Sequence, residues 1–234
     1  MHSFTMQSKQ FIHNPVDFVA QQGGSYAIAL GIDLNDLKPA EIFKWFLAAL
    51  LYGARISEKI ATHTWQVFNK HAVMSPEKII STGWDGLVAL LDEGGYARYD
   101  FKTAAKLLTV NQMLLSNYAG NLNQLHAEAK DAHDLDQRVR TLGKGVGSVT
   151  THIFLREMRG LWRKAMPPLS PLALNAAKAL GYLPNDINSD AQAFGLLQRL
   201  WLESNQKAKH FSHFESALVR YGLHLRHQDR RAAH

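Results

Sequence analysis

The sequence contains no cysteine among its 234 residues. Disulfide bonds, thiolate zinc sites and cysteine-ligated iron–sulfur clusters all require cysteine sulfur, so each of them is excluded. A metal site would have to use histidine and carboxylate ligands, and the pairs His210/His213 and His224/His227 have a spacing that puts both rings on one helical face. Because 12 histidines are scattered through the chain, such pairs arise by chance, and we predict no metal and no other cofactor.

Long apolar segments are absent as well. No uninterrupted apolar stretch reaches the length of a membrane span, and residues 1–10 are polar, without the apolar centre or cleavage site of a secretion signal. These absences predict a protein without a membrane partner and with a cytoplasmic location.

Neither β-alternation nor a repeat or low-complexity tract occurs, and apolar residues recur instead at helical spacing from Pro39 onward. The first helix runs from Pro39 to about Gly53 and is apolar on nearly all sides, which predicts burial. Later helices are expected to follow residues that cap helix N-termini: Ser75, Asp100, Asp134 and Ser170. The predicted fold class is all-α.

Two of these helices have a defined apolar face at helical spacing. After Ser75 the face consists of Ile80, Trp84, Leu87, Val88 and Leu91. After Asp100 it consists of Phe101, Ala104, Ala105, Leu108 and Leu115. We expect both faces to point into the core.

Basic residues exceed acidic ones, 26 lysines and arginines against 20 aspartates and glutamates, which gives a formal net charge of +6. This excess suits a polyanionic partner, but many basic proteins bind no nucleic acid. Charge alone therefore selects no function.

Residues 142–151 read LGKGVGSVTT and join two amphipathic helices, which together span about 134–158, by a turn of alternating glycines. Glycine permits positive φ and removes side-chain bulk, so N–H groups at the start of the second helix can converge on an anion with help from the helix dipole. A DNA phosphate is the natural occupant. A glycine-rich connector without a ligand is the alternative interpretation.

Several segments, in this order, resemble the helix-hairpin-helix DNA glycosylase superfamily of endonuclease III and adenine DNA glycosylase. Residues 50–57 (LLYGARIS) look like the family's segment between its first two barrel helices, with Arg55 where the family has glutamine. Residues 95–105 (GYARYDFKTAA) look like its turn into a helix, 142–151 like its hairpin, and 215–222 (ESALVRYG) like its final helix before the iron–sulfur loop.

The resemblance implies a six-helix barrel domain at residues 40–160, which includes the helix-hairpin-helix, and a second helical domain formed by residues 1–39 and 161–234. It also implies a monomer that binds damaged or distorted double-stranded DNA between the two domains. Such proteins flip the target base outward and fill the vacated stack with a side chain. Arg55 is the candidate filler because its planar guanidinium can stack on an orphaned base, a salt-bridged surface arginine being the alternative.

The family's catalytic positions are filled differently here. The lysine that forms a Schiff base in bifunctional members aligns with Val149, and the catalytic aspartate aligns at or near Ser170. The stretch between Glu157 and Asp186 contains no acid, and neither does the stretch 46–51, where adenine-specific members have a glutamate. A neutral serine hydroxyl can cap a helix but does not stabilise a positively charged sugar as a carboxylate does.

Besides Ser170, three side chains are candidates for catalysis. Lys144 lies in the hairpin, although a phosphate contact is its favoured interpretation. His152 has the chemistry to protonate a leaving base near neutral pH, an ordinary packed or solvated histidine being the favoured alternative. Glu157 lies about two helical turns, roughly 12 Å, beyond Val149.

The expected DNA contacts are the hairpin and the basic residues around it. They comprise Arg55, Arg98 and Lys102 together with Gly143, Lys144, Gly145, Val146, Gly147, Ser148 and Thr150. A basic run that follows the hairpin is also expected to contact DNA, a solvated helix face being the alternative; it comprises Arg156, Arg159, Arg163 and Lys164.

Three functions fit this pattern. The first is a base-excision DNA repair enzyme, a DNA N-glycosylase with or without AP-lyase activity, that uses an unorthodox acid or a water held near Ser170. The second is a non-catalytic protein that recognises bent, mismatched or damaged duplex. The third is a helical protein whose hairpin contacts another protein. We rank the glycosylase slightly above the passive module, because a base-flipping cleft is costly to retain unused, and in a prokaryote we expect association with the nucleoid.

Overall fold

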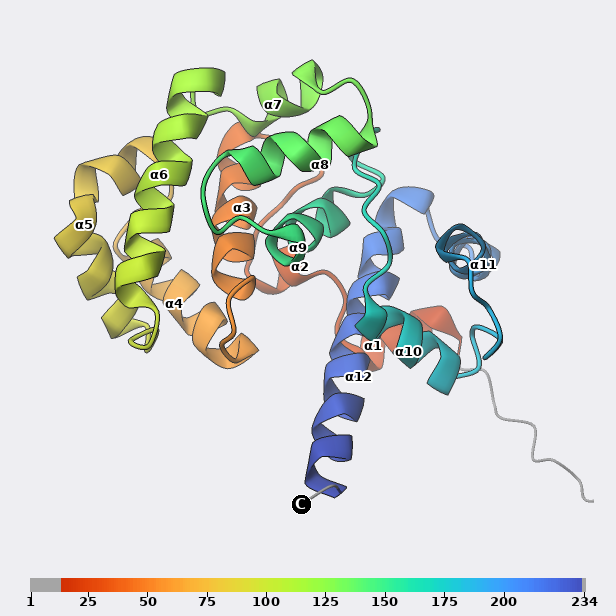
Figure 1. The fold of residues 1–234 in the computed structure, drawn as a ribbon. Helices are drawn as coiled ribbons and strands as arrows, with labels where there is room; N and C mark the ends of the chain where they lie inside the picture. Colours follow the sequence, from red (N-terminus) through yellow and green to blue (C-terminus); the bar gives the residue numbers. More distant parts are fainter. Residues whose placement is uncertain (1–13, 233–234) are drawn as a thin grey trace, which may run out of the picture. The chain divides into compact units, whose positions relative to one another are not determined.

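The computed structural model describes residues 14–232, and its regular structure is helical (Figure 1). This part of the chain forms no strand, and none of its helices is long and apolar enough to span a membrane. The all-α prediction is confirmed. The helices are α1 (Pro15–Gln22), α2 (Tyr26–Ala29), α3 (Pro39–Tyr52), α4 (Glu58–Lys70), α5 (Pro76–Glu93), α6 (Asp100–Tyr118), α7 (Leu122–Glu128), α8 (Ala132–Thr141), α9 (Ser148–Met158), α10 (Pro171–Ala179), α11 (Asp190–Glu203), the short 3₁₀ helix η1 (Ala208–His210) and α12 (Phe211–Ala232).

The described chain forms two compact units. The larger unit comprises residues 26–167, and the smaller one comprises residues 14–25 together with 168–232. The sequence interpretation had assigned residues 26–39 and 161–167 to the second domain. These residues fold with the larger unit because Tyr26, Ile32, Leu34 and Trp162 are buried in its core. The six-helix barrel stays a prediction.

Helix α3 lies at the centre of the larger unit. Every residue from Trp45 to Leu51 is fully buried, and α3 packs against α4, α7 and α9. The indole N–H of Trp45 donates a hydrogen bond of 3.0 Å to the carbonyl of Phe154 in α9. Because a fully buried large apolar side chain contributes about 1.5–3 kcal/mol, this one helix supplies a large part of the driving force for folding.

Helix α12 has the same role in the smaller unit, where it packs against α1, α10 and α11. Phe214 of α12 makes edge-on contacts with the rings of Phe18 and Tyr182, at centroid distances of 6.3 and 5.2 Å. The Trp201 ring of α11 stacks on Phe214 at 5.8 Å. Aromatic packing therefore joins elements from both ends of the described chain.

Two of the four predicted helix caps are confirmed. The hydroxyl groups of Ser75 and Ser170 accept hydrogen bonds of 3.3 and 3.1 Å from backbone N–H groups in the first turns of α5 and α10. The other two predictions are wrong. Asp131 rather than Asp134 caps α8, and Asp100 is the first residue of α6 rather than its cap.

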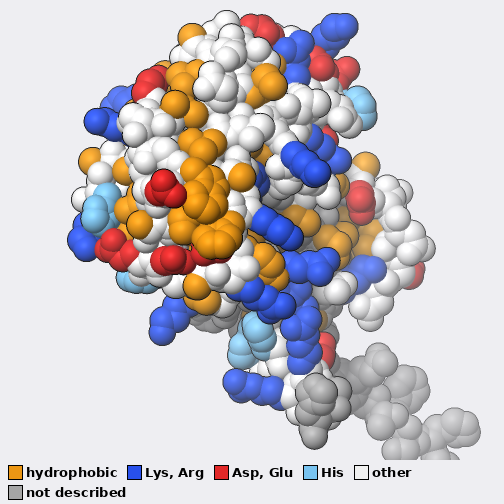
Figure 2. Space-filling view, turned by 60° about the vertical axis from the view of Figure 1, so that its left-hand side comes forward, with side chains coloured by type: hydrophobic (Ala, Val, Ile, Leu, Met, Phe, Trp, Pro, Cys, Tyr) orange, Lys and Arg blue, Asp and Glu red, His pale blue; other side chains and the backbone are white. Residues whose placement is uncertain are grey.

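The predicted apolar faces of α5 and α6 are partly wrong. Gly83 adopts φ 69° and ψ 175°, a conformation open to glycine, and this kink shifts the helical phase of α5. As a result Ile79 is buried instead of Ile80, and Trp84 is 40% exposed. In α6 Phe101 is 58% exposed, while the buried face consists of Thr103, Ala104, Leu107, Val110, Asn111, Leu114 and Tyr118. Figure 2 shows apolar side chains gathered on the side of the molecule that α5 and α6 form.

Two glycines inside helices of the smaller unit give a matched test of how closely α10 packs against α12. A Cβ on Gly222 of α12 would lie 2.8 Å from the carbonyl carbon of Leu172, whereas a Cβ on Gly195 of α11 would meet nothing within 4 Å. Gly222→Ala is therefore expected to destabilise by about 1–3 kcal/mol through overpacking, and Gly195→Ala to stabilise by about 0.5–1 kcal/mol through helix propensity. Urea unfolding followed by circular dichroism measures both; equal effects would contradict the close approach of α10 to α12.

Candidate nucleic-acid interface

The predicted hairpin connects α8 to α9 through residues 142–147. Two apolar side chains, Leu142 and Val146, are buried and hold the turn against the core. The Val146 N–H donates to the carbonyl of Gly143 at 3.1 Å, and Gly145 adopts φ +93°, which side chains rarely tolerate. Val146 was predicted as a DNA contact; its buried side chain and paired N–H make it an anchor of the turn instead.

The start of α9 is uncapped. Gly147 occupies the N-cap position, supplies no side-chain hydrogen bond, and has open space where a Cβ would stand. The first intrahelical bond runs from the Thr151 N–H to the Gly147 carbonyl, so the four preceding N–H groups have no intrahelical partner. Ser148 and Val149 are exposed, and the first turn contains no acid. At its exposed residues, 147–149, this helix end therefore presents unpaired donors and the positive end of the dipole to solvent.

Helix α6 supports the hairpin from beneath. A Cβ on Gly143 would lie 2.8 Å from Cγ2 of Val110, and one on Gly145 would lie 3.3 Å from Cδ of Lys106. The Lys106 amine donates a hydrogen bond of 2.8 Å to the carbonyl of Leu50 near the end of α3. Burial lowers the pKa of Lys106 to about 8. One cation is thus held under the turn of the hairpin.

Sequence reasoning missed Lys106 because the predicted phase of α6 placed it opposite the core. Its spacing of four residues from Lys102 is the sequence signal that indicates its position, because residues four apart lie on the same face of a helix. Lys102 is exposed one turn before Lys106, and Arg98 is exposed just ahead of α6 with its guanidinium 5.5 Å from the Tyr99 ring centroid. Arg98 and Lys102 are therefore exposed cations at the start of α6, one to two turns before the amine of Lys106.

The loop between α3 and α4 is fixed against the start of α9. A Cβ on Gly53 would overlap the Thr150 hydroxyl and lie 3.1 Å from the Thr150 Cα. Thr150, one of the predicted DNA contacts, is 2% exposed, and its side chain packs against Gly53. Arg55, two residues along the same loop, is exposed. The structure thus brings the candidate filler loop and the hairpin side of α9 together.

Three of the four cations in the predicted basic run after the hairpin make contacts within the larger unit. Arg156 is 6% exposed and its guanidinium carbon lies 5.3 Å from the ring centroid of Tyr26. Arg159, also 6% exposed, donates to the Pro167 carbonyl at 2.6 Å. Lys164 donates to the carbonyls of Ala127 and Ala129, at 3.2 and 2.5 Å. Internal contacts occupy these three cations, which leaves Arg163 as the exposed residue of the run.

The acid and base candidates are engaged in other contacts. The Ser170 hydroxyl caps α10 and belongs to the smaller unit. Glu157 is 2% exposed and accepts a hydrogen bond of 2.9 Å from the Tyr26 N–H. His152 Nε2 lies 3.3 Å from Asp136 Oδ1 in α8. Burial lowers the pKa of His152, which the Asp136 carboxylate only partly offsets, so less of the histidine carries a proton near neutral pH.

Two candidate positions remain exposed beside the hairpin. Lys144 stands in the turn, with its side chain in solvent. Val149, at the place of the family's Schiff-base lysine, is 62% exposed in the first turn of α9. The hairpin therefore presents an apolar side chain where the resemblance implies an amine.

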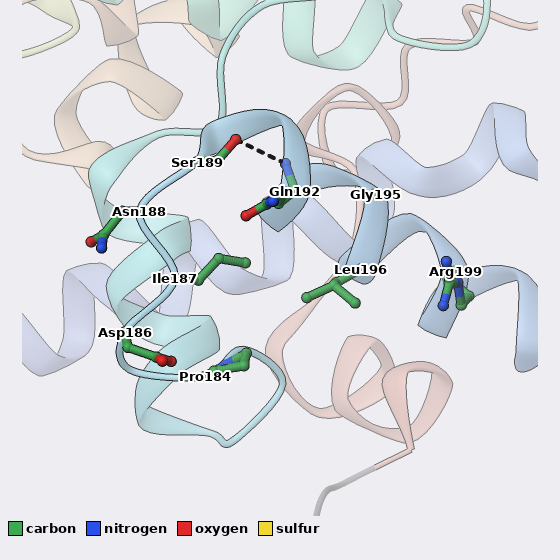
Figure 3. A pocket seen from close by; sticks show the side chains of 9 residues that line it. All are labelled: Pro184, Asp186, Ile187, Asn188, Ser189, Gln192, Gly195, Leu196 and Arg199. Atoms are coloured by element: carbon green, nitrogen blue, oxygen red, sulfur yellow. Dashed lines mark hydrogen bonds between the residues drawn. The ribbon is translucent and has the colours of Figure 1, made fainter.

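The histidine pairs and the pocket of Figure 3 lie in the smaller unit. The rings of His210 and His213 stack at 5.2 Å, and the described residues contain no group of three or more side chains that could hold a metal ion. The pocket, about 760 Å³, lies between the loop that follows α10 and one side of α11 (Figure 3). It is lined by Pro184, Asp186, Ile187, Asn188, Ser189, Gln192, Gly195, Leu196 and Arg199. None of the predicted catalytic or DNA-binding residues lines it.

Comparison with known proteins adds no identification: no protein-family model matches the chain, and no curated protein matches its sequence.

Replacing Lys106 with methionine tests the burial of its amine. The pKa is about 8 in the folded protein, against about 10.4 for a solvated lysine. Between these values the unfolded chain binds more protons, so the contribution of this group to the free energy of unfolding rises with pH. Methionine keeps an apolar stem beneath Gly145 and binds no proton. Urea titrations should show the unfolding free energy of Lys106→Met, relative to wild type, decreasing from pH 8 to pH 10; a constant difference would contradict the burial.

Proposed function

We propose that this chain is a DNA-binding protein of the helix-hairpin-helix glycosylase type and that the turn between α8 and α9 binds the phosphate backbone of duplex DNA. The uncapped start of α9 carries the proposal. Gly147 leaves the N–H groups of the first turn open to an anion, and Lys144 adds an exposed cation within the turn. A phosphate fits this combination of backbone donors, dipole and cation.

Contacts to DNA phosphates position a protein but do not depend on the base sequence. Preference for a target therefore has to come from the shape of the DNA. The α3–α4 loop supplies a suitable side chain. Arg55 is exposed in a loop that the contact between Gly53 and Thr150 holds against α9. We propose that Arg55 enters the stack where a base is displaced, so that damaged or mismatched duplex binds more tightly than intact duplex.

Substitution of Gly147 separates binding from folding. Gly147 has the extended conformation of an N-cap residue and room for a side chain, so Gly147→Asp and Gly147→Asn should both cap α9 and keep the fold. The aspartate places a carboxylate where the phosphate would bind, and affinity for a duplex should fall about tenfold or more. Gly147→Asn, of the same shape but neutral, is the matched control and should lose less.

Fluorescence anisotropy with a labelled duplex, repeated at several salt concentrations, measures both variants. Equal affinities for wild type, Gly147→Asp and Gly147→Asn would contradict phosphate binding at this helix end. Absence of any salt-dependent duplex binding by the wild-type protein would instead favour a hairpin that contacts protein.

Base excision is the second candidate function; its support is the exposure of position 149, although the valine there supplies no amine. This side chain is exposed in the first turn of α9, the turn that also packs against the Arg55 loop. A flipped nucleotide would therefore have access to position 149. Because the candidate acids and bases are engaged elsewhere, we place DNA recognition ahead of catalysis. Base release from duplexes with a broad panel of lesions, reduced by Arg55→Ala, would reverse this order.

Val149→Lys tests whether an abasic sugar reaches α9. The wild-type protein has no amine at this position and should give no borohydride-trapped complex with abasic duplex there. In the variant, the lysine amine would add to the sugar aldehyde with loss of water, and borohydride would reduce the imine to a stable amine. We expect a covalent band on denaturing gels with Val149→Lys and none with Val149→Met. A Val149→Lys protein that binds abasic duplex but traps none would count against the resemblance at this position.

A further inference from the structure

Helix α12 extends beyond the core of the smaller unit. Its first half, residues 211–219, is buried except for the half-buried His213, and Gly222 is the last buried residue of the helix. From Arg226 to Ala232 every residue is exposed. Packing against α1 and α10 therefore accounts for the first half of the helix and leaves the second half without a neighbour among the described residues.

The exposed half is basic on one side. Five basic side chains occur within eight residues: His224, Arg226, His227, Arg230 and Arg231. At about 100° per residue they fall within an arc of roughly 160°, and the single acid of this segment, Asp229, lies outside it. Figure 2 shows blue and pale-blue side chains gathered at the lower end of the molecule, where Figure 1 places the end of α12.

No ion-pair partner holds the arginines at this end of α12. Arg226, Arg230 and Arg231 form no ion pair with any residue of the described chain. Arg220, one turn and a half earlier on α12, donates to the Gly24 carbonyl, and Arg138 pairs with Asp134 and Glu128. The exposed end of α12 therefore carries three arginines without an ion-pair partner among the described residues.

Helix stability does not explain this arrangement. Cations in the last turn, such as Arg230 and Arg231, favour the helix dipole, but that effect fades within one turn and does not reach His224 or Arg226. Arg226 and Arg230 are four residues apart, and like charges at this spacing repel each other. An anionic partner would remove the repulsion.

We propose that the exposed half of α12 is a second nucleic-acid contact, in which Arg226, Arg230 and Arg231 bind phosphates of a DNA duplex independently of the hairpin. The choice of DNA rests on the proposed function. Eight helical residues cover about 12 Å, and duplex DNA carries a negative charge about every 1.7 Å of its axis, so three phosphates lie within reach of one side of the helix.

The test replaces the three arginines together by glutamine, a good helix former that removes the charge. Each phosphate contact contributes about 0.9 to the slope of log affinity against log salt, so the slope of the Arg226→Gln, Arg230→Gln, Arg231→Gln variant should fall by up to about 2.7 units. A control variant removes the same charge elsewhere, by Lys78→Gln, Arg199→Gln and Lys207→Gln at exposed positions. The control should leave the slope within about one unit of wild type.

Lysine variants and vesicle binding distinguish the role of charge from effects on folding and from membrane binding. Replacing the same arginines by lysine preserves the charge and should preserve the slope, even if a glutamine variant folds poorly. An α12 glutamine variant with the helicity, slope and affinity of wild type would overturn the inference. So would an α12 variant that binds duplex normally but loses retention on vesicles of anionic phospholipid, because the helix would then serve a membrane surface.

The same titrations distinguish this inference from the proposed function. If the salt dependence of duplex affinity falls with Gly147→Asp but not with the α12 variant, the hairpin is the DNA contact and the role of α12 is refuted. If it falls with the α12 variant alone, α12 is a DNA contact and phosphate binding by the hairpin is refuted. A wild-type protein without salt-dependent duplex binding would refute both.

Discussion

The close packing of α9 against α3 is the contact on which the proposed interface depends. The Trp45 indole bonds to the Phe154 carbonyl at 3.0 Å, and Gly53 lets the Thr150 side chain approach its backbone. These contacts fix where α9 begins and hold the Arg55 loop beside it. A larger residue at Gly53 would separate the loop from the helix, so one glycine outside the hairpin determines how the hairpin is presented.

The charges of the molecule divide into two groups with different roles. Arg156, Arg159 and Lys164 contact rings or carbonyl groups within the larger unit, and their charge serves the fold. Lys102, Lys144 and the arginines at the end of α12 are exposed to solvent. Direct contact with the phosphates of a polyanion depends on the second group, because a cation already held by an internal acceptor has few donors left for an external one. The net charge of +6 therefore does not itself measure the capacity for DNA binding.

Local signals predicted much of the secondary structure, and their failures have identifiable causes. Ser75 and Ser170 cap helices as expected because capping depends on residues close in sequence. Trp84 was misplaced because the sequence does not show that Gly83 interrupts the helical phase. Lys106 was missed for a related reason: an error of phase in α6 moves a residue from one side of the helix to another. The hairpin was found because its glycines lie within one short segment.

Local sequence by itself determined the all-α class, the position of the hairpin and the exclusion of every cysteine-based centre. These properties depend on composition or on residues a few positions apart. Only the tertiary structure decided which charged groups face solvent. Glu157 and Arg156 are buried against Tyr26, more than one hundred residues earlier in the chain, and Lys106 lies beneath Gly145. Such burial arises from packing between distant segments, which local periodicity does not encode.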